Sequence, residues 1–119
     1  MITASVVIPT YNEANNIGHL IDRITQVLED QEFEVIVVDD SSPDGTSDKV
    51  KQRDDYNKTV HLIKRESKLG LASAIVAGCK KANGQYIIMM DADLSHRPEE
   101  IKAMLGKAGE ANIVIGSRY

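Results

Sequence analysis

The hydrophobic positions of the chain alternate between short β-branched runs and longer segments with apolar residues at helical spacing. The short runs predict five strands, Ser5–Ile8, Glu34–Val38, Val60–Ile63, Tyr86–Met90 and Ile113–Ile115. The longer segments predict helices over 17–28, 46–56 and 71–82, and a fourth that starts at Pro98. Repeated strand–helix units of this kind predict an α/β fold, a mostly parallel sheet with helices on both faces.

Small and polar residues suggest where the helices begin, pack and end. Asn12 is the expected N-cap of the first helix. Gly70, Ala74 and Gly78 give the third helix a small-residue face that suits close packing on a sheet, and Gly84 is placed to stop that helix.

Length and composition restrict the classes of protein that this chain can be. The 119 residues fit one domain, over 1–119, and 42% hydrophobic residues exclude a wholly disordered chain. The apolar runs are too short to span a bilayer, the N-terminus does not resemble a signal peptide, and the single cysteine, Cys79, fits a reducing compartment, so we expect a cytoplasmic location. A net charge of −4 argues against nucleic-acid binding and means that a phosphorylated ligand needs a metal or a few placed basic groups.

Polar segments follow three of the predicted strands. They are Pro9–Glu13, Asp39–Thr46 and Asp91–Asp93. Ligands of open α/β sheets bind at the carboxyl ends of the strands, so these segments together predict a binding site at one edge of the sheet.

The segment Asp91-Ala92-Asp93 carries two carboxylates one residue apart, directly after an apolar run. Such a pair suits a hard divalent cation, with a nucleotide diphosphate supplying further oxygens, and we favour this reading. The alternative is a solvated loop with a helix-capping aspartate.

Asp39 and Asp40 close the second predicted strand. A carboxylate there can accept hydrogen bonds from the ring N–H of a base, and also from the amino group of guanine; Asp40 is the favoured contact. The alternative is that Asp39 and Asp44 cap the following turns. The segment Pro9–Glu13 has two equally supported interpretations. Tyr11 could stack on a base while Glu13 bonds a ribose hydroxyl, or the segment could simply begin a helix.

Basic groups near this edge are few. From the residues alone, Arg118 is more simply a terminal surface arginine than a phosphate ligand. Lys64, Arg65 and Lys68 are predicted to form a solvated turn before the third helix.

Five motifs in order resemble family-2 glycosyltransferases, and within them the dolichyl-phosphate (polyprenyl-phosphate) mannosyltransferases. The motifs are Pro9-Thr10-Tyr11-Asn12-Glu13, Val38-Asp39-Asp40-Ser41-Ser42-Pro43-Asp44-Gly45-Thr46, Lys68-Leu69-Gly70-Leu71, Met90-Asp91-Ala92-Asp93-Leu94-Ser95-His96 and Gly116-Ser117-Arg118-Tyr119. The resemblance covers nearly the whole chain, although Arg97 stands where relatives often have proline or histidine.

This resemblance implies a GT-A (Rossmann-like) fold and metal-dependent transfer of mannose from GDP-mannose to dolichyl or polyprenyl phosphate, with inversion at the sugar carbon. By position, the resemblance implies that the nucleoside pocket is lined by Pro9, Tyr11, Glu13, Val38 and Asp40. It implies that Asp91, Ala92 and Asp93 contact the diphosphate and its Mg²⁺ or Mn²⁺, and that Arg118 contacts a phosphate. Asp91 and Asp93 are then the catalytic and metal-binding residues. No general base is assigned, because a lipid phosphate is already an anion.

The resemblance also implies that the chain holds the N-terminal, donor-binding half of a domain that continues further in relatives. For the full enzyme it implies peripheral contact with the cytoplasmic face of a membrane. A first alternative is a non-catalytic fragment that binds the nucleotide sugar. A second is a receiver-like phosphoacceptor domain, which the positions of the acids disfavour, since receivers carry them after the first and third strands.

Overall fold

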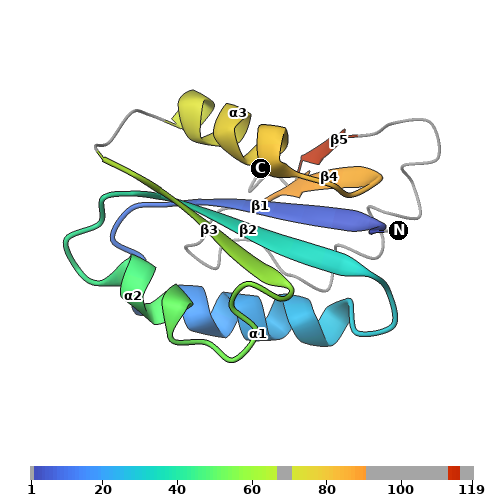
Figure 1. Cartoon of the computed structure of the whole chain (residues 1–119), viewed down its shortest axis with the longest axis horizontal. Coiled ribbons are helices and arrows are strands. Elements are labelled where there is room, and N and C mark those ends of the chain that lie inside the picture. The colour runs from blue at the N-terminus through green and yellow to red at the C-terminus, as the bar shows by residue number, and fades with distance from the viewer. Residues whose placement is uncertain (1, 67–70, 91–112, 116–119) are drawn as a thin grey trace.

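A computed structural model describes residues 2–66, 71–90 and 113–115 of the chain (Figure 1). The elements in this part of the chain are β1 (Ala4–Thr10), α1 (Ile17–Val27), β2 (Phe33–Asp40), α2 (Thr46–Lys51), β3 (Val60–Arg65), α3 (Leu71–Lys81), β4 (Tyr86–Met89) and β5 (Ile113–Ile115). Each of the five predicted strands is present. The first three extend further toward their carboxyl ends than predicted, so Thr10, Asp40 and Arg65 belong to strands rather than to loops.

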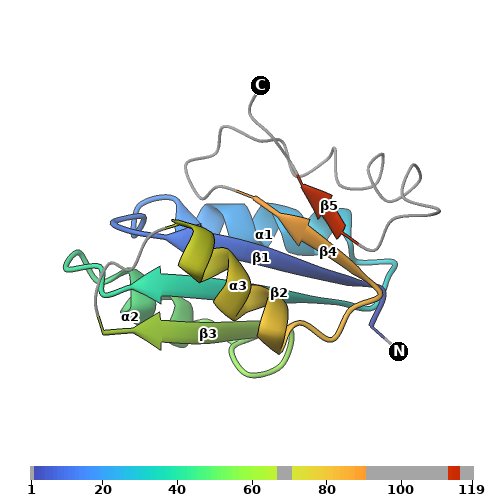
Figure 2. The ribbon, with the colours of Figure 1, turned by 90° about the horizontal axis from the view of Figure 1, so that it is seen from above.

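The described strands form one parallel sheet in the order β3-β2-β1-β4-β5. The chain moves outward from β1 to β3 on one side and then crosses to β4 and β5 on the other (Figure 2). The order therefore reverses between β1 and β4, and such a switch point is where ligands of doubly wound sheets bind. Receiver domains have the order 2-1-3-4-5, so this sheet does not have the receiver topology.

The two faces of the sheet are covered by different helices, with α1 and α2 on one side and α3 on the other (Figure 1). Because strand side chains alternate, Val6 and Ile8 pack on the α1 side and Val7 packs on the α3 side. The predicted α/β architecture with helices on both faces is confirmed. No helix in the described ranges is both long enough and apolar enough to cross a bilayer.

The ends of the first two helices differ from the prediction. Asn12 does not cap α1: it has a φ of 58°, and the N-cap is Asn16, four residues further along the chain. The reason is a turn in which the N–H groups of Asn16 and Ile17 both donate to the Glu13 carbonyl, at 3.0 and 2.9 Å. The second helix ends at Lys51 rather than at residue 56, because the chain turns there and Tyr56 forms a β-bridge with Val60.

The small-residue face of α3 does pack closely on the sheet. A Cβ atom at Gly78 would lie 2.3 Å from Val7 Cγ1, so only glycine allows the observed approach of α3 to β1. Gly84 has a different role from the predicted helix stop, since α3 already ends at Lys81. Its Cβ would lie 2.6 Å from the Ser5 backbone nitrogen, and its N–H donates to Ser5 Oγ at 2.7 Å.

Candidate functional site

The loops that follow β1 and β2 form one tied structure at the carboxyl edge of the sheet. Three backbone N–H groups of the first loop donate to side-chain oxygens of the second. These bonds are Asn12 N to Ser42 Oγ at 2.8 Å, Glu13 N to Thr46 Oγ1 at 3.0 Å and Ala14 N to Asp44 Oδ2 at 3.1 Å. The segment that contains Tyr11 and Glu13 is therefore held against the segment that follows Asp40.

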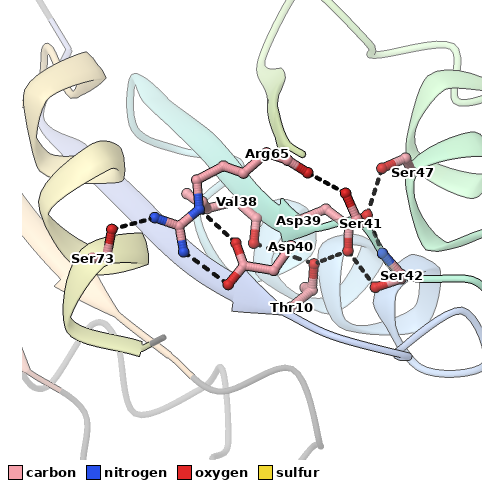
Figure 3. Close-up of polar contacts among 9 residues, drawn as sticks. All are labelled: Thr10, Val38, Asp39, Asp40, Ser41, Ser42, Ser47, Arg65 and Ser73. Atoms are coloured by element: carbon pink, nitrogen blue, oxygen red, sulfur yellow. Dashed lines mark hydrogen bonds and ion pairs between the residues drawn. The ribbon is translucent and has the colours of Figure 1, made fainter. Parts of the chain in front are cut away.

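Asp39 is the buried centre of this arrangement, with none of its surface exposed (Figure 3). Oδ1 accepts from Thr10 Oγ1 at 2.8 Å and from Ser42 Oγ at 2.5 Å, and Oδ2 accepts from Ser47 Oγ at 2.6 Å. Ser42 also donates its backbone N–H to Oδ2, at 3.3 Å. Four donors thus stabilise the carboxylate and fix the turn after β2, which is the capping role weighed for Asp39.

Asp44 fixes the start of α2 in a similar way. It accepts the Thr46 N–H at 3.1 Å and the Thr46 hydroxyl at 2.6 Å, in addition to the N–H of Ala14. The hydrogen bond from the Thr46 hydroxyl lowers the pKa of Asp44, with smaller contributions from the backbone N–H groups of Ala14 and Thr46. Gly45 takes the left-handed conformation, with a φ of 88°, that lets the chain enter the helix.

Asp40 points to the opposite face of the sheet, toward α3, and pairs with Arg65 (Figure 3). The two form a bidentate ion pair, Nε to Oδ1 at 2.5 Å and Nη2 to Oδ2 at 2.8 Å, and Arg65 Nη1 also donates to Ser73 Oγ at 2.6 Å. The hydrogen bond to Asp40 raises the pKa of Arg65 above its ordinary value. Both adjacent aspartates are buried: Asp39 has no exposed surface, and Asp40 keeps 8% of its side chain exposed.

The prediction of a solvated turn is wrong for Arg65. β3 continues through this residue, and the parallel register places Arg65 directly beside Asp40, which largely buries its guanidinium. Lys64 also belongs to β3, but it is exposed, and Lys68 lies outside the described residues. A signal for the pair was available in the sequence: Arg65 stands at the same distance from the apolar run of β3 as Asp40 does from that of β2.

The other predicted pocket residues differ in how accessible they are. Tyr11 is 40% exposed, and Pro9 and Glu13 are partly buried. Asn16 Nδ2 donates to Glu13 Oε2 at 3.3 Å. Val38 is fully buried on the α3 side of the sheet, where its Cγ2 lies 3.3 Å from the position of a Cβ on Gly78. Tyr11, Glu13 and Asp40 are thus brought to one edge of the sheet, whereas the side chain of Val38 belongs to the core.

The predicted diphosphate and metal residues, Asp91, Ala92, Asp93 and Arg118, lie outside the described residues. The chain reaches this motif through Met90, whose N–H donates to the Val7 carbonyl at 3.1 Å. Met90, the last described residue before the motif, therefore lies beside β1 at the switch point of the sheet. Within the part of the chain that the structure describes, no group of three or more His, Cys, Asp or Glu residues is arranged to hold a metal. The carboxylates of Asp91 and Asp93 would fit Mg²⁺ or Mn²⁺ chemically, because both ions prefer oxygen ligands.

Curated relatives match almost the whole chain. It is 44% identical over 117 residues to a dolichol-phosphate mannosyltransferase of Pyrococcus furiosus, a match that covers 97% of this chain and 33% of the relative. It is 38% identical to an undecaprenyl-phosphate mannosyltransferase of Micrococcus luteus, covering 94% of this chain and 46% of the relative. The chain thus spans from a third to just under half the length of these relatives.

Solved structures agree with the sequence relatives. A mannosyltransferase from Pyrobaculum calidifontis in complex with GDP-Man and Mn²⁺ superimposes with a TM-score of 0.68 at 30% identity, over 76% of this chain and 27% of that one. A glucosyl-3-phosphoglycerate synthase from Mycobacterium tuberculosis, in complex with Mn²⁺, UDP and glucosyl-3-phosphoglycerate, has a TM-score of 0.69 at 25% identity, over 88% of this chain and 39% of that one.

The family model for glycosyl transferase family 2 matches residues 5–119. This match includes all five motifs that suggested the resemblance, and the relatives include enzymes named as polyprenyl-phosphate mannosyltransferases. The chain belongs to glycosyl transferase family 2.

Proposed function

We propose that the protein transfers mannose from GDP-mannose to dolichyl or polyprenyl phosphate with inversion at the sugar carbon, and that residues 1–119 supply the nucleotide-sugar site. The observation that carries the proposal is the joined pair of loops after β1 and β2. Hydrogen bonds from the Asn12, Glu13 and Ala14 N–H groups hold the segment with Tyr11 and Glu13 against the segment that follows Asp40, at the edge where ligands of doubly wound sheets bind. The similarity to named mannosyltransferases supports mannose as the sugar.

In this proposal each residue contacts a defined part of the donor. Tyr11, with 40% of its surface exposed, stacks on the base, Asp40 accepts hydrogen bonds from the base, and Glu13 bonds a ribose hydroxyl. Pro9 and Val38 shape the pocket wall through the paired ends of β1 and β2, where Pro9 lies opposite Val38. Arg118 contacts the phosphates.

Asp91 and Asp93 hold Mg²⁺ or Mn²⁺ together with the diphosphate, and Ala92 lies against the diphosphate. Held by Asp91 and Asp93, the metal would supply positive charge to stabilise the departing nucleoside diphosphate. A Mn²⁺ ion accompanies GDP-Man in the structure from Pyrobaculum calidifontis, which supports a divalent ion here. The net charge of −4 on this chain means that a diphosphate ligand needs positive charge from a metal or from a few placed basic groups, and a divalent ion would supply it.

The acceptor is a lipid phosphate, whose anionic oxygen attacks the sugar carbon without a general base. Such a substrate places the full enzyme in peripheral contact with a membrane, on its cytoplasmic face. The names of the relatives from Pyrococcus furiosus and Micrococcus luteus support this acceptor class.

Calorimetry with GDP-mannose tests the donor site. We expect binding in the presence of Mg²⁺ or Mn²⁺ that is lost in EDTA and strongly weakened in Asp93→Asn, since one carboxylate ligand is removed. Arg53→Lys is the matched control, because Arg53 lies on the α2–β3 connection and pairs with Asp22 and Asp55. Equal affinity with and without metal would refute the donor-site proposal.

Release of GDP in the presence of a polyprenyl phosphate tests the transfer itself. A second candidate function is that residues 1–119 alone bind the donor without turnover. It is favoured because the chain covers only 33% and 46% of the mannosyltransferases from Pyrococcus furiosus and Micrococcus luteus. Metal-dependent donor binding without GDP release would support this second candidate. Turnover above that of Asp93→Asn would support the complete reaction.

A further inference from the structure

The hydroxyl of Thr46 joins the loop after β1 to the loop after β2. It accepts a hydrogen bond from the Glu13 N–H at 3.0 Å and donates its own proton to Asp44 Oδ1 at 2.6 Å. We propose that Thr46 is a positioning residue that gives the site its preference for an intact ribose, because it fixes the backbone from which the Glu13 carboxylate meets the sugar. This inference rests on the ribose contact proposed for Glu13.

The direction of the Thr46 hydroxyl is set by the acid that accepts its proton. A hydroxyl has one proton to donate and two lone pairs that can accept. The hydrogen bond from Thr46 lowers the pKa of Asp44, so this acceptor is ionised at neutral pH. A lone pair of the Thr46 oxygen is then left for the Glu13 N–H, and the two hydrogen bonds strengthen each other.

Thr46 is a rigid support for this contact. It is fully buried, and its branched Cβ restricts the side chain to few rotamers. Thr46 is the first residue of α2, where its N–H donates to Asp44 Oδ1 at 3.1 Å and Gly45 before it is left-handed. The Thr46 oxygen therefore has little freedom to move, and it fixes the position of the Glu13 N–H.

Glu13 is held on both sides of its Cα atom. Its N–H is bound by Thr46, and its carbonyl accepts the N–H groups of Asn16 and Ile17, at 3.0 and 2.9 Å. In the carboxylate, Oε2 accepts from Asn16 Nδ2 at 3.3 Å, while Oε1 accepts no hydrogen bond from the residues that the structure describes. Glu13 is only partly buried, and one carboxylate oxygen thus remains as an acceptor for a sugar hydroxyl.

A neighbouring contact between the two loops provides a comparison. Ser42 Oγ accepts the Asn12 N–H at 2.8 Å and donates to Asp39 Oδ1 at 2.5 Å, so it makes the same kind of bond one residue earlier in the first loop. A role that only holds the loops together would be shared by Ser42 and Thr46. A role in ribose binding belongs to Thr46, whose bond is made to Glu13 itself.

The test measures the affinities for GDP, 2′-deoxy-GDP and 3′-deoxy-GDP by calorimetry in the presence of Mn²⁺. A hydrogen bond to an ionised carboxylate predicts that the unmodified chain binds GDP about tenfold more tightly than the weaker of the two deoxy analogues. Glu13→Ala should remove most of this preference. In Thr46→Val, which keeps the shape of the side chain but not the hydroxyl, the preference should fall to about twofold or less, whereas Thr46→Ser should keep it.

The control is Ser42→Ala, which removes the neighbouring contact between the loops. It should weaken the binding of GDP and of the deoxy analogues by similar factors and so keep their ratio. Circular dichroism and the thermal midpoint show whether each variant is folded. If Thr46→Val is not, Asp44→Ala at an exposed position takes its place and should also lower the preference, since the Thr46 hydroxyl is then no longer oriented.

The outcomes separate this inference from the proposed function. If the unmodified chain binds none of the three nucleotides, the proposed donor site fails and the role of Thr46 fails with it. If it binds GDP without preferring it to either deoxy analogue, the inference is overturned and the donor site stands. The inference is also overturned if folded Thr46→Val, or Asp44→Ala in its place, keeps the full preference, or if Ser42→Ala loses it to the same extent.

Discussion

Replacing Gly78 with alanine should destabilise the protein, although alanine is the better helix former. Gly78 lies in α3, where the added Cβ would be 2.3 Å from Val7 Cγ1 and 3.3 Å from Val38 Cγ2. Ordinary carbon contacts are about 3.5–4.0 Å, so α3 or β1 must move by roughly 1 Å or more. Both valines are fully buried, so neither has solvent to move into.

The magnitude follows from two opposing contributions. Alanine gains about 1 kcal/mol of helix propensity over glycine. Overpacking a close-packed core costs about 1–3 kcal/mol and sometimes more. Because the 2.3 Å approach is severe, the cost should fall in the upper part of that range, about 2–3 kcal/mol, which leaves a net loss of about 1–2 kcal/mol in the free energy of unfolding. With an m-value of about 2 kcal/mol per M, this loss lowers the urea midpoint by roughly 0.5–1 M.

Gly18 provides the matched control, because it is also a helical glycine but has open surroundings. The nearest atom to its Cβ position is Arg53 Nη1 at 3.9 Å, an ordinary contact. Gly18→Ala should therefore stabilise the protein by up to about 1 kcal/mol. In the double variant Val7→Ala with Gly78→Ala, the loss should be smaller than the sum of the single losses, because the shortened side chain makes room. A urea midpoint for Gly78→Ala at or above that of the unmodified chain would refute the packing argument.

Three further predictions concern the hydrogen bonds that hold the loops and the sheet. Asp39→Asn should lower the free energy of unfolding by about 1–3 kcal/mol in urea titrations, because the amide nitrogen cannot accept the bonds made to one carboxylate oxygen; an unchanged midpoint would contradict this. The Thr46 hydroxyl lowers the pKa of Asp44 in the folded state. The ionised Asp44 carboxylate therefore stabilises the fold at pH values above its ordinary pKa of 3.8, and this stabilisation is lost as the pH falls through the lower pKa of the folded state. Asp44→Asn should accordingly weaken the acid dependence of the thermal midpoint below about pH 5, and an identical acid profile would argue against the Thr46 contact. Ser5→Ala removes the acceptor of the partly buried Gly84 N–H and should lower the free energy of unfolding by about 1–3 kcal/mol in denaturant titrations. A variant as stable as the unmodified chain would contradict this prediction.

The fold class was predictable because the apolar pattern is local and strong. The runs around Val35–Val38 and Tyr86–Met90 are buried strands, as their β-branched and apolar residues indicate. The helix ends were less predictable. α2 ends at Lys51 because residues beyond it turn toward β3, and Arg53 there bonds to the carbonyl of Gly18 and to Asp22 in α1, contacts between segments far apart in the sequence.

The candidate site was predicted in part. The alternation of strand side chains means that Asp39 and Asp40 face opposite sides of the sheet, so one is enclosed by the loops and the other faces α3. The capping role that sequence reasoning weighed as the alternative for Asp39 is present in the structure, whereas the base contact favoured for Asp40 stays a prediction. Sequence reasoning missed the partner of Asp40, because a basic cluster before a helix resembles an exposed turn until the register of β3 against β2 is known.

The amino-acid sequence by itself determined the order of strands and helices and the acidic segments that follow the strands. Both depend on neighbouring residues, through the period of the apolar positions and the residues that end each run. Only the tertiary structure decided the strand order, which pairs β1 with β4, segments about eighty residues apart, and which sets Asp40 beside Arg65. These pairings come from hydrogen bonds and burial between distant segments, and the local apolar pattern is the same for several strand orders.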